Sequence, residues 1–362
     1  MKGNSENNMT IITKKNKHYN TLSTEDKYNG INWNNINDDF DLQTFDILTS
    51  QFWTSTRIPV SNDLKNWRKA DVAKREVVDL AFSGLTTLDT LQSREGSDAL
   101  IAGSTTPHEI DVYNNIRYME SIHARSYSTI FTSLNPNKRV DEIFEWGSDN
   151  EHLQEKIRLL NEVYASGDHI KSKIASVYLE SFLFYSGFYP ALRLINEFPN
   201  VAEIIKLIIR DESVHGAYVG YKFKLQYAKM TDKEKQEIRD YAYNFLFKLY
   251  EIECKYTEDI YDRIGWTEDV KKFVEYNANK ALSNLGLDQV FATTEADVNP
   301  LVIRGLSTGS VNHDFFSQVG NSYIIGKVEM PSDIDYTMIA VNSDKTQYNE
   351  VSERKVNKSR YI

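Results

Sequence analysis

Two glutamate–histidine pairs recur at the same spacing in this 362-residue chain. Each has the form E-x-x-H, with Glu120–His123 in one predicted helix and Glu212–His215 in another. Because residues three apart on a helix lie on the same side, each pair can offer a carboxylate and an imidazole to one point. Two such helices, with one carboxylate from each of two further helices, form the dinuclear metal site of ferritin-like bundles. The pattern therefore requires two more carboxylates.

Asp89 and Glu180 are the candidates for these two ligands. Asp89 lies on the apolar face of its predicted helix, and Glu180 is surrounded in sequence by aliphatic and aromatic residues. A carboxylate in such surroundings is costly unless it is paired or binds a metal. Four carboxylates and two imidazoles are hard ligands, which suit iron or manganese rather than copper(I) or structural zinc.

A single E-x-x-H motif is more often a hydrogen-bonded surface pair than a metal site. The similar pair Asp149–His152 lies in a polar stretch, and we interpret it as solvated surface. Both E-x-x-H motifs, by contrast, lie in otherwise apolar helices and occur together with two carboxylates that we expect to be buried. The joint pattern favours a metal site.

The role of Tyr127 decides between two functions for this site, a radical enzyme and a metal-storage protein. It follows His123 by four positions, so it lies on the ligand face about 6 Å further along the helix axis. A tyrosine there could give an electron to an oxidised metal pair and remain as a radical. It could equally be a core tyrosine whose hydroxyl is satisfied by a hydrogen bond. The residues by themselves leave both interpretations open.

Long helices have to position these residues. Apolar residues recur at helical spacing, no proline interrupts 68–91, 112–134 or 202–230, and no alternating strand pattern competes. Pro107 suits a helix start, and Asn135–Asn137 suits a stop. We expect an all-α, ferritin-like helical bundle with extra helices over residues 36–306. Residues 1–35 are interpreted as a polar leader and 307–362 as a flexible tail, because both are polar and rich in turn residues.

Composition excludes several classes of protein. The formal net charge of -10 argues against a nucleic-acid surface, which requires clustered lysine and arginine. Cys254 is the only cysteine, so an intrachain disulfide and a thiolate metal cluster are both excluded. No apolar segment resembles a signal peptide or a membrane span, which predicts a soluble, cytoplasmic protein with no membrane partner.

The chain resembles the radical-generating beta subunit of class I ribonucleotide reductase, particularly the class Ib branch. The resemblance spans roughly residues 30 to 330, and jointly its motifs are specific. They are 85–90, 118–128, 175–188, 209–216, 276–282 and 312–316.

The resemblance implies a role for each matched position. The six metal ligands would be Asp89, Glu120, His123, Glu180, Glu212 and His215. Tyr127 would hold the radical, shielded by an apolar wall of Phe184, Phe188 and Ile208. Trp53 resembles a relay tryptophan that hydrogen-bonds Asp211. Some family members lack three of the carboxylates and work without metal, but this chain keeps all six ligands, so we expect a dinuclear manganese or iron centre.

The resemblance also implies partners. A homodimer would pass the radical to a large (alpha) subunit that reduces ribonucleotides, and manganese loading would require a flavodoxin-like activating protein. The tail would dock into the large subunit, with Tyr336 as the first candidate for its relay tyrosine and Tyr323 as the second. The extension after Met338 departs from the family's short acidic ending. Two alternatives remain, a ferritin-like oxidase or storage protein without radical export, and a dimetal oxygenase with an open substrate cavity.

Overall fold

The structure is a computed structural model that describes residues 30–309. Within this range the chain is all-α and contains no strand, so the predicted fold class is confirmed. Its α-helices are α2 (Asp39–Ser50), α3 (Leu64–Lys69), α4 (Val72–Leu91), α5 (Ser97–Ala102), α6 (Pro107–Leu134), α7 (Asn137–Asp149), α8 (Glu151–Ala165), α9 (His169–Tyr178), α10 (Phe184–Arg193), α11 (Pro199–Ala228), α12 (Asp232–Tyr261), α13 (Thr267–Leu285) and α14 (Pro300–Gly309). Two π-helical segments, η2 (Gln92–Gly96) and η3 (Leu179–Leu183), continue α4 and α9. Three short 3-10 helices are η1 (Val60–Asp63), η4 (Asp262–Ile264) and η5 (Glu295–Asp297).

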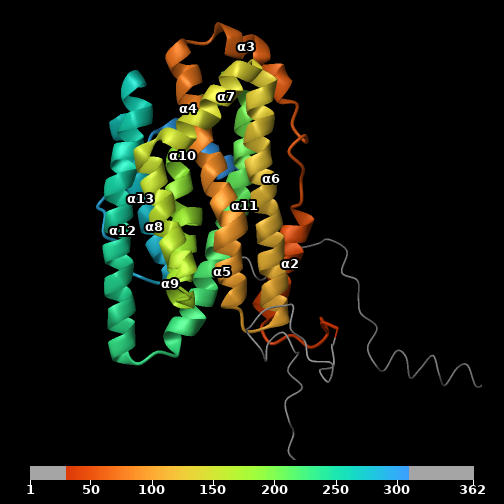
Figure 1. Ribbon diagram of the computed structural model, residues 1–362, viewed down its shortest axis with the longest axis vertical. Coiled ribbons are helices and arrows are strands. Elements are labelled where there is room, and N and C mark those ends of the chain that lie inside the picture. The colour runs from red at the N-terminus through yellow and green to blue at the C-terminus, as the bar shows by residue number, and fades with distance from the viewer. Residues whose placement is uncertain (1–29, 310–362) are drawn as a thin grey trace, which may run out of the picture. The chain divides into compact units, whose positions relative to one another are not determined.

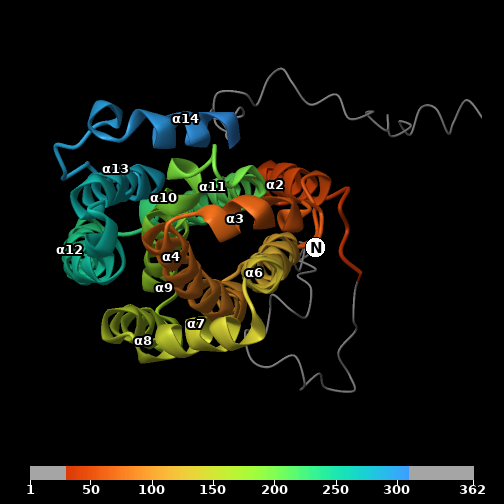
Figure 2. The same ribbon diagram turned by 90° about the horizontal axis from the view of Figure 1, so that it is seen from above.

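Four long segments form the core of the bundle. They are α4, α6, α11 and the continuous segment made of α9, η3 and α10. Helix α4 packs against α6 and α10, and α11 packs against α6, α9 and α10. Figure 1 shows α4, α6, α11 and the continuous α9–η3–α10 segment running along the long axis of the bundle. Seen from above in Figure 2, α7 and α8 lie on one side of this core, and α12 and α13 lie on another. This is the ferritin-like arrangement in which residues on facing helices build an interior site.

The helix that carries Asp89 begins later than the sequence pattern indicated. No proline interrupts 68–91, but α3 ends at Lys69 and the backbone of Ala70 is extended, with ψ 152°. Asp71 then caps α4, since its side chain accepts a hydrogen bond from the backbone N–H of Ala73. A capping aspartate competes with helix continuation, which is why the break falls here.

Helix α6 begins and ends as predicted. Pro107 occupies its first turn, and the side chain of Thr106 accepts a hydrogen bond from the backbone N–H of Glu109. The helix ends at Leu134, just before Pro136, because a residue preceding proline is disfavoured in the helical conformation. The whole length of 28 residues is therefore continuous α-helix, so helical spacing holds along it.

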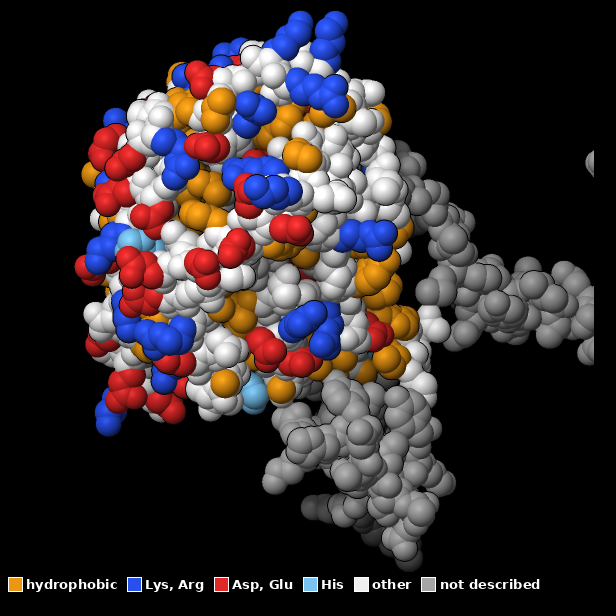
Figure 3. Space-filling view, turned by 45° about the horizontal axis from the view of Figure 1, so that its top comes forward, with side chains coloured by type: hydrophobic (Ala, Val, Ile, Leu, Met, Phe, Trp, Pro, Cys, Tyr) orange, Lys and Arg blue, Asp and Glu red, His pale blue; other side chains and the backbone are white. Residues whose placement is uncertain are grey.

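The described range covers only parts of the predicted terminal segments. Helix α14 extends to Gly309, past the boundary that we expected at 306. The remainder of the tail and residues 1–29 lie outside the described residues. No helix within 30–309 is long and apolar enough to cross a membrane. On the face that Figure 3 shows, acidic and basic side chains are interspersed, with no large basic patch.

Candidate metal centre

The two E-x-x-H pairs face each other across α6 and α11. All four side chains are fully buried. Nδ1 of His123 lies 2.9 Å from Oε1 of Glu212, and Nδ1 of His215 lies 2.7 Å from Oε1 of Glu120. Each imidazole thus points its Nδ1 atom toward the glutamate of the opposite helix. The spacing within each helix and the packing between the helices together bring the four ligand atoms to one place.

Asp89 from α4 and Glu180 from η3 complete two overlapping groups of four potential ligands. The first, called here the Asp89 position, contains Asp89, Glu120, His123 and Glu212. The second, called the Glu180 position, contains Glu120, Glu180, Glu212 and His215. In each group the ligand atoms lie within 4.8 Å of one another, and Glu120 and Glu212 belong to both. Shared carboxylates between two positions are the arrangement of a carboxylate-bridged dinuclear centre.

Several polar atoms of these groups are buried without a hydrogen-bond partner. Both oxygens of Asp89, Oε2 of Glu120 and Oε2 of Glu180 have no hydrogen-bond partner within the described range. Buried carboxylate oxygens are almost always satisfied in folded proteins, because leaving them bare is costly. Four carboxylates also carry a charge that two divalent cations would balance. The ligands present therefore fit a pair of divalent metal ions with oxygen-rich coordination.

Electrostatics within the cluster favour the same conclusion. Burial and the charge of Glu120 raise the pKa of both Asp89 and Glu180 well above the ordinary range. Burial alone would also raise the pKa of Glu212, but the hydrogen bond from Glu180 and the charge of His123 hold it below its ordinary range. Protons thus offset the crowding of negative charge, and divalent cations would displace them because they favour the charged carboxylates.

Trp53 and Asp211 extend the centre away from the metal ligands. Trp53, in the segment between α2 and η1, donates from Nε1 to Oδ2 of Asp211 at 2.6 Å. The same oxygen lies 3.2 Å from Nε2 of His123, and the rings of Trp53 and His123 are stacked with centroids 5.8 Å apart. Since Nδ1 of His123 faces the cluster, Nε2 carries the hydrogen and donates to Asp211. The predicted link between Trp53 and Asp211 is therefore present as a hydrogen bond.

Arg210 belongs to this chain of contacts and was not predicted. Its guanidinium donates twice to Oδ1 of Asp211, at 2.8 and 3.1 Å, and once to the backbone oxygen of Gln51 at 2.7 Å. Arg210 precedes Asp211 in sequence, but neighbours in a helix point in different directions, so spacing gave no signal for the contact. The arginine thus joins the Asp211 carboxylate to the backbone of the segment that carries Trp53.

Tyr127 is fully buried one helical turn beyond His123. Its hydroxyl has no hydrogen-bond partner among residues 30–309. Burial and the charge of Asp89 raise the pKa of Tyr127 well above its ordinary value. The ring in contact with Tyr127 is that of Phe82, with centroids 5.4 Å apart. Phe82 lies two turns before Asp89 on the same helix, a spacing that could have identified it.

The residues of the predicted apolar wall are buried, but the backbone just before Phe184 is not α-helical. Phe184, Phe188 and Ile208 have no exposed surface. Phe184 and Phe188 follow Glu180 by four and eight residues, which would place all three on one face of an α-helix, but Leu179–Leu183 is π-helical. Because a π-helix takes more residues per turn, α-helical spacing does not hold between Glu180 and Phe184. Such π-helical segments are frequent at functional sites.

The remaining sequence predictions fall away from the centre. His152 is 21% exposed and lies 2.8 Å from Asp259 through Nδ1, so its partner is on α12 and not the exposed Asp149. The interpretation of this pair as solvated surface is therefore corrected for His152. Tyr336, Tyr323 and the extension after Met338 lie outside the described residues.

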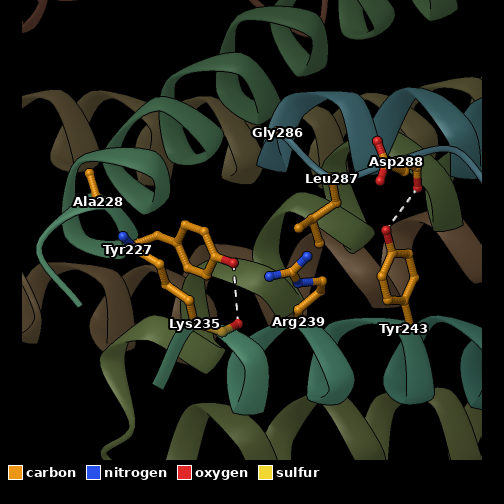
Figure 4. A pocket seen from close by; sticks show the side chains of 8 residues that line it. All are labelled: Tyr227, Ala228, Lys235, Arg239, Tyr243, Gly286, Leu287 and Asp288. Atoms are coloured by element: carbon orange, nitrogen blue, oxygen red, sulfur yellow. Dashed lines mark hydrogen bonds between the residues drawn. The ribbon is translucent and has the colours of Figure 1, made fainter. Parts of the chain in front are cut away.

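A surface cavity of about 380 Å³ lies elsewhere on the bundle. Figure 4 shows its lining, in which the hydroxyls of Tyr227 and Tyr243 donate to the backbone oxygens of Lys235 and Asp288. None of its lining residues belongs to the metal centre or to the Trp53 contacts. This cavity therefore does not provide the open substrate space beside the metals that an oxygenase would need.

The fold and the centre define a helical-bundle protein with a dinuclear carboxylate site. Comparison with known proteins then gives the particular family. The sequence model of the family described as "Ribonucleotide reductase, small chain" matches residues 30–300. The chain belongs to this family.

Relatives and solved structures agree with the match. The ribonucleoside-diphosphate reductase subunit beta of Mycobacterium leprae is 47% identical over 314 residues, which are 86% of this chain and 97% of the relative. The ribonucleoside-diphosphate reductase 2 subunit beta of Escherichia coli K12 is 44% identical over 313 residues, 86% of this chain and 98% of the relative. The crystal structure of Streptococcus sanguinis dimanganese(II)-NrdF is 53% identical with a TM-score of 0.77, and the match covers 78% of this chain and 100% of that one. Because the relatives are named as one subunit of an enzyme, membership of the family implies a large-subunit partner.

Proposed function

We propose that this chain is the radical-generating small subunit of a class I ribonucleotide reductase and that Tyr127 carries the radical. The single observation that carries the proposal is the Tyr127 hydroxyl, which is fully buried, unpartnered and on the helix face of Glu120 and His123. Two manganese or iron ions, when bound, supply the capacity for one-electron oxidation. The similarity to a dimanganese protein favours manganese. The ligands would be Asp89, Glu120, His123, Glu180, Glu212 and His215.

The surroundings of Tyr127 suit the formation and storage of a phenoxyl radical. Because its pKa is raised, the phenol is neutral at physiological pH and has to lose a proton together with an electron. Tyr127 has no contact with solvent, so this proton passes to a group inside the protein. After burial itself, the charge of Asp89 has the largest effect on the pKa of Tyr127. The ring of Phe82 and the absence of solvent contact keep reductants away from the radical.

Export of the radical would use the hydrogen bond between Trp53 and Asp211. An oxidised indole is acidic, and Oδ2 of Asp211 at 2.6 Å is positioned to accept its proton. From Trp53 the relay would continue through Tyr336 of the tail to the large subunit, where ribonucleotides are reduced to deoxyribonucleotides. The sole cysteine, Cys254, gives this chain no thiol pair of its own for that reduction.

The assembly belongs to the same proposal. The chain would act in the cytoplasm as a homodimer, together with its large subunit. A flavodoxin-like protein would activate the manganese form, as the resemblance to the class Ib branch implies. Adding such a protein to the manganese-loaded chain should be required for the radical, whereas iron loading with oxygen should not require it.

Electron paramagnetic resonance tests the assignment of the radical. After metal loading and activation, the wild-type chain should show a tyrosyl signal that Tyr127→Phe abolishes. Tyr113→Phe is the matched control, because Tyr113 is also on α6, fully buried and unpartnered at its hydroxyl, seven residues before Glu120 rather than seven after it. A tyrosyl signal that survives Tyr127→Phe, or one lost equally in both variants, would refute the assignment.

Metal titration separates this function from storage. A dinuclear radical centre takes two ions per chain, as the two groups of ligands predict, whereas a storage protein continues to take up iron beyond that ratio. Ribonucleotide turnover that appears only after a large subunit is added would further exclude a free-standing oxidase or oxygenase.

A further inference from the structure

Glu180 is held from outside the metal centre by one buried amide. Nε2 of Gln92 donates to Oε1 of Glu180 at 2.6 Å, and Gln92 has no exposed surface. This bond occupies Oε1 and leaves Oε2 of Glu180 turned to the cluster, 3.6 Å from Nδ1 of His215. The geometry therefore determines which oxygen of Glu180 can reach a metal ion.

The amide of Gln92 is itself fixed by two further contacts. Its nitrogen also donates to Oγ of Ser176 at 2.8 Å, and its oxygen accepts from the hydroxyl of Tyr164 at 2.9 Å. Both amide hydrogens and the amide oxygen are thus used. Because the amide oxygen accepts from Tyr164, the amide nitrogen faces Glu180. A buried polar network in which every member is satisfied is rigid and specifies one arrangement.

The backbone is shaped to admit this side chain. A Cβ atom on Gly96 would clash with Oε1 of Gln92 and lie 3.2 Å from a ring carbon of Tyr164, so glycine leaves room for the observed position of Gln92. Gln92 begins the π-helical segment η2, and Glu180 lies within the π-helical segment η3. The hydrogen bond between Gln92 and Glu180 therefore joins two π-helical segments, and such segments are frequent at functional sites.

The two metal positions are anchored differently. At the Asp89 position, His123 is oriented by Asp211, while both oxygens of Asp89 lack a partner. At the Glu180 position, Nε2 of His215 lacks a partner, and the outside anchor acts on Glu180 instead. Each position thus has one anchored ligand, a histidine in the first case and a carboxylate in the second.

We propose that Gln92, fixed by Tyr164, is a positioning residue that sets the metal affinity of the Glu180 position and leaves the Asp89 position largely unaffected. The inference rests on the proposed function, because it presumes that the centre binds two ions. Losing a hydrogen bond from a residue that orients a metal ligand without touching the metal typically lowers metal affinity about 10- to 100-fold. The loss of affinity should affect only one of the two metal ions bound per chain.

The test is a titration of the metal-free full-length chain with Mn(II), in which the free ion is followed by its electron paramagnetic resonance signal. Gln92→Met keeps the shape of the side chain and removes the amide. Tyr164→Phe keeps the amide and removes the hydroxyl that fixes it. Tyr178→Phe is the matched control, because its buried hydroxyl also donates at 2.9 Å, but to the backbone oxygen of Ala242. Anomalous scattering from crystals at limiting Mn(II) then assigns the weakened equivalent to a position.

The wild-type chain should bind two equivalents, and Gln92→Met should weaken one of them about 10- to 100-fold, with the loss of occupancy at the Glu180 position. Tyr164→Phe should weaken the same equivalent by less, and Tyr178→Phe neither. Equal weakening of both equivalents, or no weakening in Gln92→Met, would overturn the assignment and leave the proposed function standing. A wild-type chain that binds fewer than two ions would overturn the proposed function and this inference together.

Discussion

Replacing Asp211 with asparagine removes one carboxylate oxygen from a place where four nitrogen donors meet. Oδ2 accepts from Trp53 and His123, and Oδ1 accepts twice from Arg210. Asparagine has the same shape but only one accepting oxygen, so its amide nitrogen has to face one of the two pairs of donors. Trp53 and His123 are almost completely buried, whereas 27% of the Arg210 side chain is exposed and it retains its bond to Gln51. We therefore expect the nitrogen to turn toward Arg210.

The magnitude of the effect follows from these contacts. Hydrogen bonds to charged groups contribute about 1.5–3 kcal/mol each, and partial exposure of Arg210 reduces the loss, so the free energy of unfolding should fall by about 2 kcal/mol. Trp53 retains an acceptor, but a neutral amide oxygen takes up a proton far less readily than a carboxylate. Ribonucleotide turnover with the large subunit should therefore fall about 10- to 100-fold. The tyrosyl signal per bound metal pair should persist, because Tyr127 does not contact Asp211.

Three measurements on one preparation check this prediction. They are chemical denaturation, the tyrosyl signal per bound metal pair, and turnover with saturating large subunit. Asp79→Asn is the matched control, since Asp79 is also buried and accepts from an arginine and an amide, Arg139 at 3.0 Å and Asn135 at 2.9 Å. Wild-type turnover in Asp211→Asn, or an equal loss of turnover in Asp79→Asn, would refute the reasoning.

Three further predictions concern stability. Burial raises the pKa of Asp79 to about 6 despite the charge of Arg139, so its stabilising contribution is complete below its unfolded pKa of 3.8 and is lost as the pH rises through 6. Between pH 4 and 7 the free energy of unfolding of the wild type should thus fall by about 2 kcal/mol relative to Asp79→Asn in denaturant titrations, and parallel pH profiles would contradict this. Lys156→Met should lower the free energy of unfolding by about 3–5 kcal/mol, since it leaves Glu253 buried without its ion-pair partner at 2.6 Å, and a second change, Glu253→Met, should restore much of the loss. Chelation of both metal ions should lower the free energy of unfolding by about 5 kcal/mol at a hundredfold excess of metal over its dissociation constant, and unchanged stability would argue against tight binding.

The sequence by itself determined the relations that lie within one helix. Glu120, His123 and Tyr127 share a face because α6 is unbroken, and periodicity of 3.6 residues encodes that face directly. The same holds for Glu212 and His215 on α11. The cost of burying Asp89 and Glu180 marked them as special before any packing was known. The all-α bundle followed from the same periodicity.

Only the tertiary structure decided which residues meet across helices and where the helical period changes. The hydrogen bond from Gln92 to Glu180 spans 88 residues of sequence and depends on two π-helical segments that have no signal in hydrophobic spacing. The contact of Arg210 with Asp211, and that of Phe82 with Tyr127, depend on how side chains turn once the helices have packed. Helical periodicity determines the direction in which a side chain points from its own helix. Which side chain it meets on another helix depends on how the two helices cross, and the local sequence does not encode that crossing. For this protein, the sequence therefore indicated the candidate metal ligands, and packing determined the groups that orient them.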